Sequence, residues 1–376
     1  MLRFLTAGES HGKALVAIID GLPAGVPVDV AAIDAEMKRR QFGYGRGPRM
    51  KFESDHVEVL SGVRRGKTLG SPVALEILNK DASIDRLPVV TQPRPGHADL
   101  TGAIKYDHRD IRNILERASA RETAARVAVG AVCQQFLTPL GIDLASHVLA
   151  LGSTRALASS KPLSAAQIRR RADASPVRCL DARAAKRMTR EIDECVTRGD
   201  TLGGVFEVVA VGAPPGLGSH VQYDRRLDAI LAHAIMSIHA VKAVEVGDGV
   251  AGASVRGSKV QDEIFYSTAK GFYRSSNRAG GFEGGMTTGQ PIVVRGFMKP
   301  LSTLRAPLRS VEINTKRPVV ATVERSDVTT VPAAGVVGEA MVAFELAKAM
   351  LDKFGGDSLR EVSRNHQAYR RQVGAF

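Results

Sequence analysis

The stretch from Gln92 to Val132, QPRPGHADLTGAIKYDHRDIRNILERASARETAARVAVGAV, decides how the rest of the chain is organised. It places His97 in a proline-braced loop ahead of a cationic helix entry. Ser119 and Glu122 have the spacing of a capping box, in which the serine hydroxyl accepts from a first-turn amide and the glutamate reaches back. Apolar residues then recur at three- and four-residue steps, which predicts a helix whose apolar face ends before Pro139: Ala125, Val129, Val132 and Phe136.

The entry to this helix is a candidate anion site. A helix N-terminus carries free amides and a partial positive charge, so it attracts anions. Arg117 and Arg121, one turn apart, would add two fixed cations beside it. From these residues alone, a capped surface helix with solvated arginines is an equally good interpretation.

Other motifs extend the pattern along the chain. The stretch 6–12 reads TAGESHG, 40–47 reads RQFGYGRG, 280–285 reads GGFEGG and 323–327 reads VERSD. With RPGHAD, ERASARET and the Lys299-Pro300 pair, these motifs resemble chorismate synthase in sequence order, as far as about Glu345. No single motif is decisive, but this many in order leave little room for accident.

Composition limits the classes of partner. The net charge of +13 favours nucleic acid, anionic membranes or small polyanions. Aromatic residues make up only 5% with no Trp, and Lys and Arg are dispersed, so we expect no nucleic-acid partner. No apolar run approaches the ~20 residues of a membrane span, so we expect a soluble, cytoplasmic protein with no membrane partner.

The cysteines and histidines give no sign of a metal site. The three cysteines, Cys133, Cys179 and Cys195, have no CxxC spacing. His233 and His239 lie six residues apart and therefore on different helix faces. We predict no protein-bound metal.

Hydrophobic periodicity predicts a mixed α+β chain. The expected strands are 2–5, 14–20, a period-two region within 51–78, 147–151, 178–180, 203–211, 292–298 and 318–324. The expected helices are 30–41 capped by Asp29, 164–172, 182–198, 227–238 and 336–354. The resemblance implies more than this pattern could choose: a β-α-β sandwich of antiparallel sheets flanking central helices, as a single domain over 1–376 that forms a homotetramer.

Two glycine-rich loops supplement the central stretch. Gly43 to Arg49 alternates glycines with Arg46 and Arg49, which suits a cationic loop closing over a phosphate, although a plain linker is the alternative. Asn277 to Gly289 lacks the lysine and spacing of a Walker A loop. Several such loops at scattered strand ends predict one site for a small polyanion.

The resemblance implies which polyanion and which reaction. Chorismate synthases take 5-enolpyruvylshikimate 3-phosphate, require reduced FMN, and eliminate phosphate by an anti-1,4-elimination. The arginines implied for these anions are Arg40, Arg46, Arg49, Arg117, Arg121 and Arg325, of which Arg40 and Arg46 match positions associated with NADP(H).

The resemblance also assigns the catalytic roles. His97 would protonate the leaving phosphate, as a side chain that titrates near neutral pH can. His11 would lie near the reduced flavin. Asp327 would assist proton removal, with its neighbour Arg325 keeping it ionised.

The implied FMN contacts are Arg117, Ala118, Ser119, His239, Ala240, Gly284, Lys299, Pro300, Leu301, Ser302, Thr303 and Arg325. His239 departs from the family, because many members carry an amide residue there. A FMN oxidoreductase acting on an anionic substrate is the alternative enzyme, and a basic RNA-binding protein is the non-enzymatic one.

Overall fold

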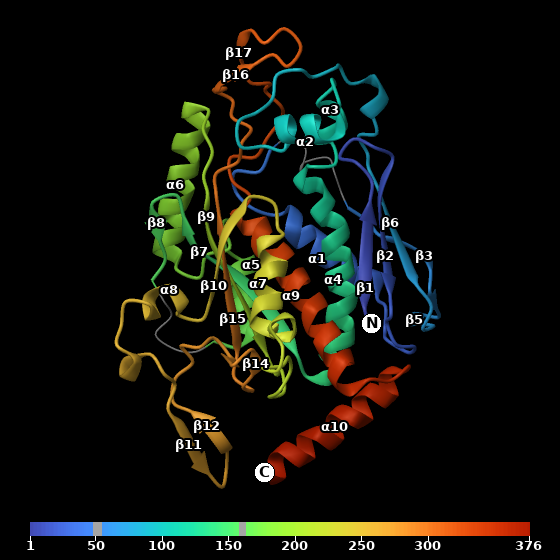
Figure 1. Ribbon diagram of the computed structural model, residues 1–376, viewed down its shortest axis with the longest axis vertical. Coiled ribbons are helices and arrows are strands. Elements are labelled where there is room, and N and C mark those ends of the chain that lie inside the picture. Colours follow the sequence, from blue (N-terminus) through green and yellow to red (C-terminus); the bar gives the residue numbers. More distant parts are fainter. Residues whose placement is uncertain (48–54, 158–162) are drawn as a thin grey trace.

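The computed structural model describes residues 1–47, 55–157 and 163–376, and this part of the chain forms two antiparallel sheets on either side of a helical layer (Figure 1). The centre of that layer is α4 (Thr123–Leu137) and α9 (Val331–Phe354), and α1 (Val30–Gln41) packs against both. The expected α+β sandwich is therefore confirmed.

The first sheet comes from the N-terminal part of the chain. Its strand order is β1 (Arg3–Ala7), β2 (Ala14–Asp20), β6 (Val73–Leu78) and β3 (Glu58–Ser61), with every pair antiparallel. Alternate residues of β2 and β6 are buried toward the helices, which is the predicted period of two. The region is thus antiparallel sheet, as expected.

The second sheet closes the other side of the helical layer. Its order is β10 (Val241–Val246), β15 (Ile292–Met298), β9 (Gly204–Val211), β7 (Asp143–Leu151) and β8 (Thr154–Arg155). Helix α7 (Leu227–Met236) packs against α9 and against strands β10 and β15 of this sheet. The strands β9 and β15 match the predicted segments, whereas β7 begins four residues earlier than expected.

Helices α4 and α9 approach closely through small residues. A Cβ added at Gly130 would lie 2.3 Å from both Cα and Cβ of Ala340. Helix α4 is buried on nearly all sides, so the single apolar face predicted from the sequence was too narrow.

The remaining elements lie around this sandwich. The other helices are α2 (Asp99–Tyr106), α3 (Arg112–Leu115), α5 (Ala165–Asp173), α6 (Ala182–Arg198), α8 (Gly249–Gly252) and α10 (Leu359–Ala375). Short hairpins join β4 (Val63–Arg64) to β5 (Lys67–Thr68), β11 (Ile264–Ser267) to β12 (Gly271–Arg274), β13 (Phe282–Glu283) to β14 (Met286–Thr287) and β16 (Arg309–Val311) to β17 (Pro318–Val320). Within the described ranges, no helix is long and apolar enough to cross a membrane.

The capping box predicted at Ser119 and Glu122 is wrong. The Ser119 hydroxyl accepts from the Arg121 amide, and a 3₁₀ turn over Ala120–Glu122 precedes α4. Glu122 instead accepts from the Thr6 hydroxyl at 2.8 Å and from Nε of Arg126 at 2.8 Å. A tertiary partner has displaced the local one.

Three other predicted elements change. Residues 178–180 are not a strand, because Arg178 adopts a left-handed φ of 57° and buries its guanidinium. Strand β17 ends at Val320 rather than Glu324. Helix α9 begins at Val331, five residues before the predicted start, with Pro332 in its first turn where proline is tolerated.

Candidate active site

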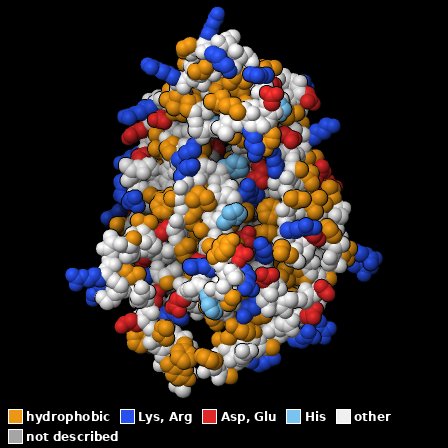
Figure 2. All heavy atoms as spheres, in the orientation of Figure 1, with side chains coloured by type: hydrophobic (Ala, Val, Ile, Leu, Met, Phe, Trp, Pro, Cys, Tyr) orange, Lys and Arg blue, Asp and Glu red, His pale blue; other side chains and the backbone are white. Residues whose placement is uncertain are grey.

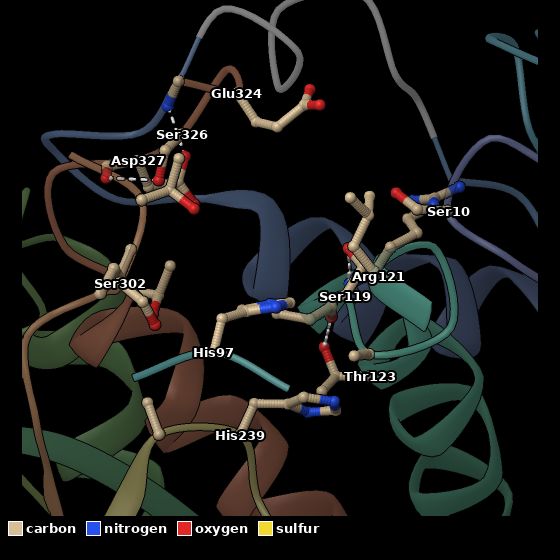
Figure 3. Close-up of a pocket in the computed structure, with 18 of the residues that line it drawn as sticks. Ser10, His97, Ser119, Arg121, Thr123, His239, Ser302, Glu324, Ser326 and Asp327 are labelled. Atoms are coloured by element: carbon tan, nitrogen blue, oxygen red, sulfur yellow. Dashed lines mark hydrogen bonds between the residues drawn. The ribbon is translucent and has the colours of Figure 1, made fainter. Parts of the chain in front are cut away.

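A cavity of about 500 Å³ opens where several loops converge on the N-terminal ends of α4 and α9. Its walls come from the segment before α4, the first turns of α9, the turn after α7, and the loops around residues 94–98, 299–303 and 324–327. Figure 3 shows His97, His239, Ser302 and Asp327 arranged around this space. A volume of this size suits a small-molecule site.

The cavity is strongly cationic. Among the described residues that line it, three are carboxylates (Glu116, Glu324 and Asp327) and six are lysines or arginines: Arg40, Arg46, Arg94, Arg121, Lys299 and Arg325. A surplus of this kind in a recess favours a ligand with several negative charges.

Two buried arginines share a single carboxylate at the back of the cavity. Asp55 lies 2.7 Å from Nη2 of Arg40 and 2.5 Å from Nη1 of Arg121. Burial, together with the neighbouring Arg121, lowers the pKa of Arg40 despite its pairing with Asp55. Nε of Arg40 is buried with no hydrogen-bond partner among the described residues. Two guanidinium groups thus lie close together around Asp55, in a recess where a bound anion would be stabilised.

His97 is held by a buried ion pair. Its Nδ1 lies 2.5 Å from Oδ1 of Asp99, and Asp99 also accepts from Nε of Arg94 at 2.8 Å. Burial alone would raise the pKa of Asp99, but the hydrogen bonds from His97 and Arg94 outweigh it and hold that pKa far below its usual range. Since Asp99 is ionised, Nδ1 of His97 carries the hydrogen, and Nε2 is the nitrogen left for chemistry.

His11 is anchored to Glu116, the residue before Arg117. The Glu116 carboxylate accepts from the His11 backbone amide at 2.9 Å and lies 2.9 Å from Nδ1 of the ring. Burial would raise the pKa of Glu116, but the hydrogen bonds from His11 and from Arg112 hold it below its usual range. The strand turn at residues 8–12 is thus attached to the cationic segment that precedes α4.

Asp327 has a different partner from the expected one. Its Oδ2 lies 3.0 Å from Nη1 of Arg46, and its Oδ1 accepts from the Gly47 amide at 2.5 Å. Arg325 instead points toward Asp81 at 3.4 Å, with 63% of its side chain exposed. The expected pairing of Asp327 with Arg325 is wrong, because Arg46 from the glycine-rich loop is the arginine that pairs with it.

The cavity wall formed by residues 299–303 combines a cation with uncharged groups. Nζ of Lys299 lies 3.3 Å from the Ser302 hydroxyl, which donates to the Gly96 carbonyl at 3.1 Å and so connects this wall to the His97 loop. Burial lowers the pKa of Lys299, and the like charge of Lys242 adds to the effect. Ile238, Ala240 and the first turns of α9 supply apolar surface for a flat ring.

The cavity collects most of the residues that the sequence nominated. Its lining includes His11, His97, Asp327, Arg40, Arg46, Arg121, Ala118, Ser119, His239, Ala240, Lys299, Leu301, Ser302, Thr303 and Arg325. Three described candidates, Arg117, Pro300 and Gly284, lie outside the lining. Arg117 instead donates to the backbone carbonyls of Gly8 and Thr6 at 2.9 and 2.8 Å. Arg49 falls outside the described residues.

Sequence reasoning missed the residues that hold the catalytic candidates. Arg94 and Asp99 flank His97 within RPGHAD, and Glu116 opens the ERASARET motif. The spacing of Asp99, two residues after His97, was a usable signal, since a carboxylate beside a histidine can fix the imidazole tautomer. The pairing of Glu116 with His11 joins segments 105 residues apart and had no local signal.

Fold and cavity together define an enzyme with a deep cationic pocket for a small polyanion, containing two carboxylate-anchored histidines. Across the three described ranges, no group of three or more His, Cys, Asp or Glu residues is placed to hold a metal ion.

Comparison with known proteins specifies the class. The family model described as chorismate synthase matches residues 2–351. A chorismate synthase of Symbiobacterium thermophilum is 56% identical over 389 residues, covering 99% of this chain and 99% of that protein. A chorismate synthase of Geobacter sulfurreducens is 54% identical over 395 residues, covering 100% of each. A crystal structure of chorismate synthase matches with a TM-score of 0.83 and 46% identity, covering 100% of this chain and 99% of that one.

The chain belongs to the chorismate synthase family. It is a lyase of the chorismate-forming step of the shikimate pathway, which leads to the aromatic amino acids. Family membership implies a flavin cofactor and decides between the enzymatic alternatives in favour of the lyase.

Proposed function

We propose that the protein converts 5-enolpyruvylshikimate 3-phosphate to chorismate and inorganic phosphate by anti-1,4-elimination, with reduced FMN required but not consumed. The observation that carries this proposal is the surplus of positive charge in the cavity, whose described lining holds six lysines or arginines and three carboxylates. Arg40 and Arg121 lie at its back, both beside Asp55. A substrate with two carboxylates and a phosphate complements this charge.

In the elimination one carbon–oxygen bond and one carbon–hydrogen bond break, and phosphate and a proton depart. His97 protonates the leaving phosphate through Nε2, because Asp99 occupies Nδ1 at 2.5 Å and stabilises the imidazolium. Phosphate leaves more readily as it gains this proton. Arg94, bound to both Asp99 and the Thr303 hydroxyl, keeps the His97 loop against the wall at 299–303.

The proton from carbon leaves on the other side of the substrate. Asp327 is the carboxylate available there, held by Arg46 and by the Gly47 amide. His11, with Glu116 on Nδ1, is the second carboxylate-anchored imidazole of the cavity. Reduced flavin, when bound, would supply electron density to the elimination.

The lining residues fit FMN. Ala118, Ser119 and the 299–303 loop present hydroxyls, backbone amides and the Lys299 ammonium for its phosphate and ring edge, and Ala240 and Ile238 present apolar surface for its ring. We assign FMN contact to Ala118, Ser119, His239, Ala240, Lys299, Leu301, Ser302, Thr303 and Arg325. The predicted contacts of Arg117, Pro300 and Gly284 would be indirect, since these residues lie outside the lining.

Three further features belong to this proposal. Direct use of NADP(H) would involve Arg40 and Arg46, but Arg40 is only 4% exposed and paired with Asp55, which supports a substrate role instead.

A single domain over 1–376 is supported by one buried apolar cluster that runs from Leu2 to Val362 and includes residues of both sheets. A homotetramer is supported by Leu5, Ile18 and Leu78, which are exposed on the outer side of the first sheet. Sedimentation equilibrium would test the homotetramer.

The test is anaerobic incubation of the protein with the phosphate ester and reduced FMN, measuring chorismate and phosphate together. The proposal expects equal amounts of the two products, and none without flavin. Arg121→Ala is expected to weaken substrate binding by about 100-fold, because it removes a buried charge contact. Phosphate release without chorismate would overturn the proposal.

A further inference from the structure

His239 occupies a strained turn at the wall of the cavity. It lies after α7 and before β10, next to Ala240, which has a left-handed φ of 64° that non-glycine residues rarely adopt. The Ala240 carbonyl accepts from the Lys299 amide at 2.9 Å, which fixes the turn against the 299–303 loop. In Figure 3 the ring of His239 lies near that of His97 and extends toward the Ser119–Thr123 segment.

Only one ring nitrogen of His239 is accessible. Nδ1 is buried and has no hydrogen-bond partner among the described residues. The described part of the chain offers Nε2 no partner either, and Nε2 is not among the buried polar atoms, so it is the nitrogen exposed to the cavity. A buried orphan N–H is rarer than a buried orphan lone pair, so the neutral ring carries its hydrogen on Nε2.

Burial and the surrounding charges favour the neutral form of His239 in the free protein. Burial is the main cause that lowers its pKa, and Arg126, His97 and Arg117 lower it further, while Glu122 opposes them. Glu122 is already bound by Nε of Arg126 at 2.8 Å and by the Thr6 hydroxyl at 2.8 Å. No ion pair holds a proton on this ring within the described residues.

We propose that His239 takes up one proton from solvent when an anionic flavin binds, so that the flavin affinity of this chain increases as the pH falls. This inference rests on the proposed function of the same cavity. An anion beside Nε2 stabilises the imidazolium, and by linkage a protonated ring strengthens binding of the anion by the same factor. An amide side chain at this position could not ionise, so replacing His239 with Asn or Gln should abolish the coupling.

The experiment is calorimetric titration of the full-length protein with FMN, in pairs of buffers that differ in ionisation enthalpy, from pH 5.5 to 8.5. The proteins are wild type, His239→Asn and the matched control His233→Asn, which makes the same change on α7 outside the cavity lining. The FMN phosphate, which titrates near pH 6, and the other histidines contribute equally to all three. The difference between proteins therefore isolates residue 239.

We expect His239→Asn to take up about half a proton fewer per FMN than wild type near neutral pH, and His233→Asn to match wild type. Between pH 8 and pH 6, the affinity of wild type should improve by about tenfold relative to His239→Asn. His239→Gln provides a second amide variant if the asparagine variant does not fold. Equal proton uptake by wild type and the amide variants would overturn this inference and leave the FMN assignment intact. Failure of wild type to bind FMN would overturn both.

Discussion

Two of the charge clusters in the described part of the chain are constructed differently. The closed cluster consists of Arg39, Arg169 and Arg178 with Glu36, Asp173 and Glu339. At its centre Glu339 on α9 lies 2.8 Å from Arg39, 3.2 Å from Arg169 and 3.3 Å from Arg178. Three arginines face three carboxylates, so the cluster is neutral.

The cavity cluster uses the same residue types without balance. Arg40 and Arg121 share Asp55, and the lining holds more cations than carboxylates among the described residues. The neighbours Arg39 and Arg40, one after the other on α1, belong to different clusters. The comparison teaches that balanced charge stabilises the fold, whereas a surplus of positive charge in a recess favours binding of an anionic ligand.

Breaking the closed cluster should have the largest effect on the free energy of unfolding. Glu339→Gln leaves three arginines short of one buried countercharge and should lower the free energy of unfolding by about 3–5 kcal/mol. The control Glu324→Gln, whose own side chain at the cavity wall is 30% exposed and pairs with Arg112, should change it by less than about 1 kcal/mol. Urea unfolding checks both values, and equal small losses would show that the closed cluster is not structural.

The closed cluster should also give a specific acid dependence. Burial would raise the pKa of Glu339, but Arg39 and then Arg169 and Arg178 outweigh it and lower that pKa from 4.5 to about 2. A carboxylate with a lowered folded pKa contributes stability above pH 4.5 and loses it as the pH falls toward 2, about 3 kcal/mol in all. The advantage of wild type over Glu339→Gln in urea midpoints should shrink below pH 4.5. A constant advantage from pH 6 to 3 would contradict this assignment.

In the cavity, substitutions should affect chemistry more than folding. His97→Ala should lower turnover by about 100-fold or more, since it removes the acid for the leaving phosphate. FMN affinity should change by less than about threefold, and His108→Ala, in the same sequence stretch but outside the lining, should have no effect on turnover. If flavin binding and turnover fall together, His97 has a structural role instead.

Asp327→Asn should lower turnover less than His97→Ala does. The amide keeps the shape and the contact with the Gly47 amide but removes the charge paired with Arg46. We expect about tenfold slower turnover, unchanged folding and near-normal binding of both ligands. Wild-type turnover in this variant would exclude Asp327 as the base.

The comparison also explains what the sequence could reveal. The α+β pattern, strands β2, β9 and β15, and most cavity residues were predictable, because period-two alternation and short motifs are local signals. The closed cluster was not. Arg178 was predicted within a strand and no local signal marked Arg39, because their partners lie on α5 and α9, far along the chain. The Arg46–Asp327 pair was missed for the same reason, since 280 residues separate Gly47 from Asp327.

The central claim is that the cationic cavity holds a phosphate ester and reduced FMN together for an elimination without net redox change. The most direct measurement is the flavin balance under strict exclusion of oxygen. A small amount of reduced FMN should support many turnovers, with chorismate and phosphate formed equally and the flavin still reduced at the end. Oxidation of one FMN for each phosphate released would contradict the account.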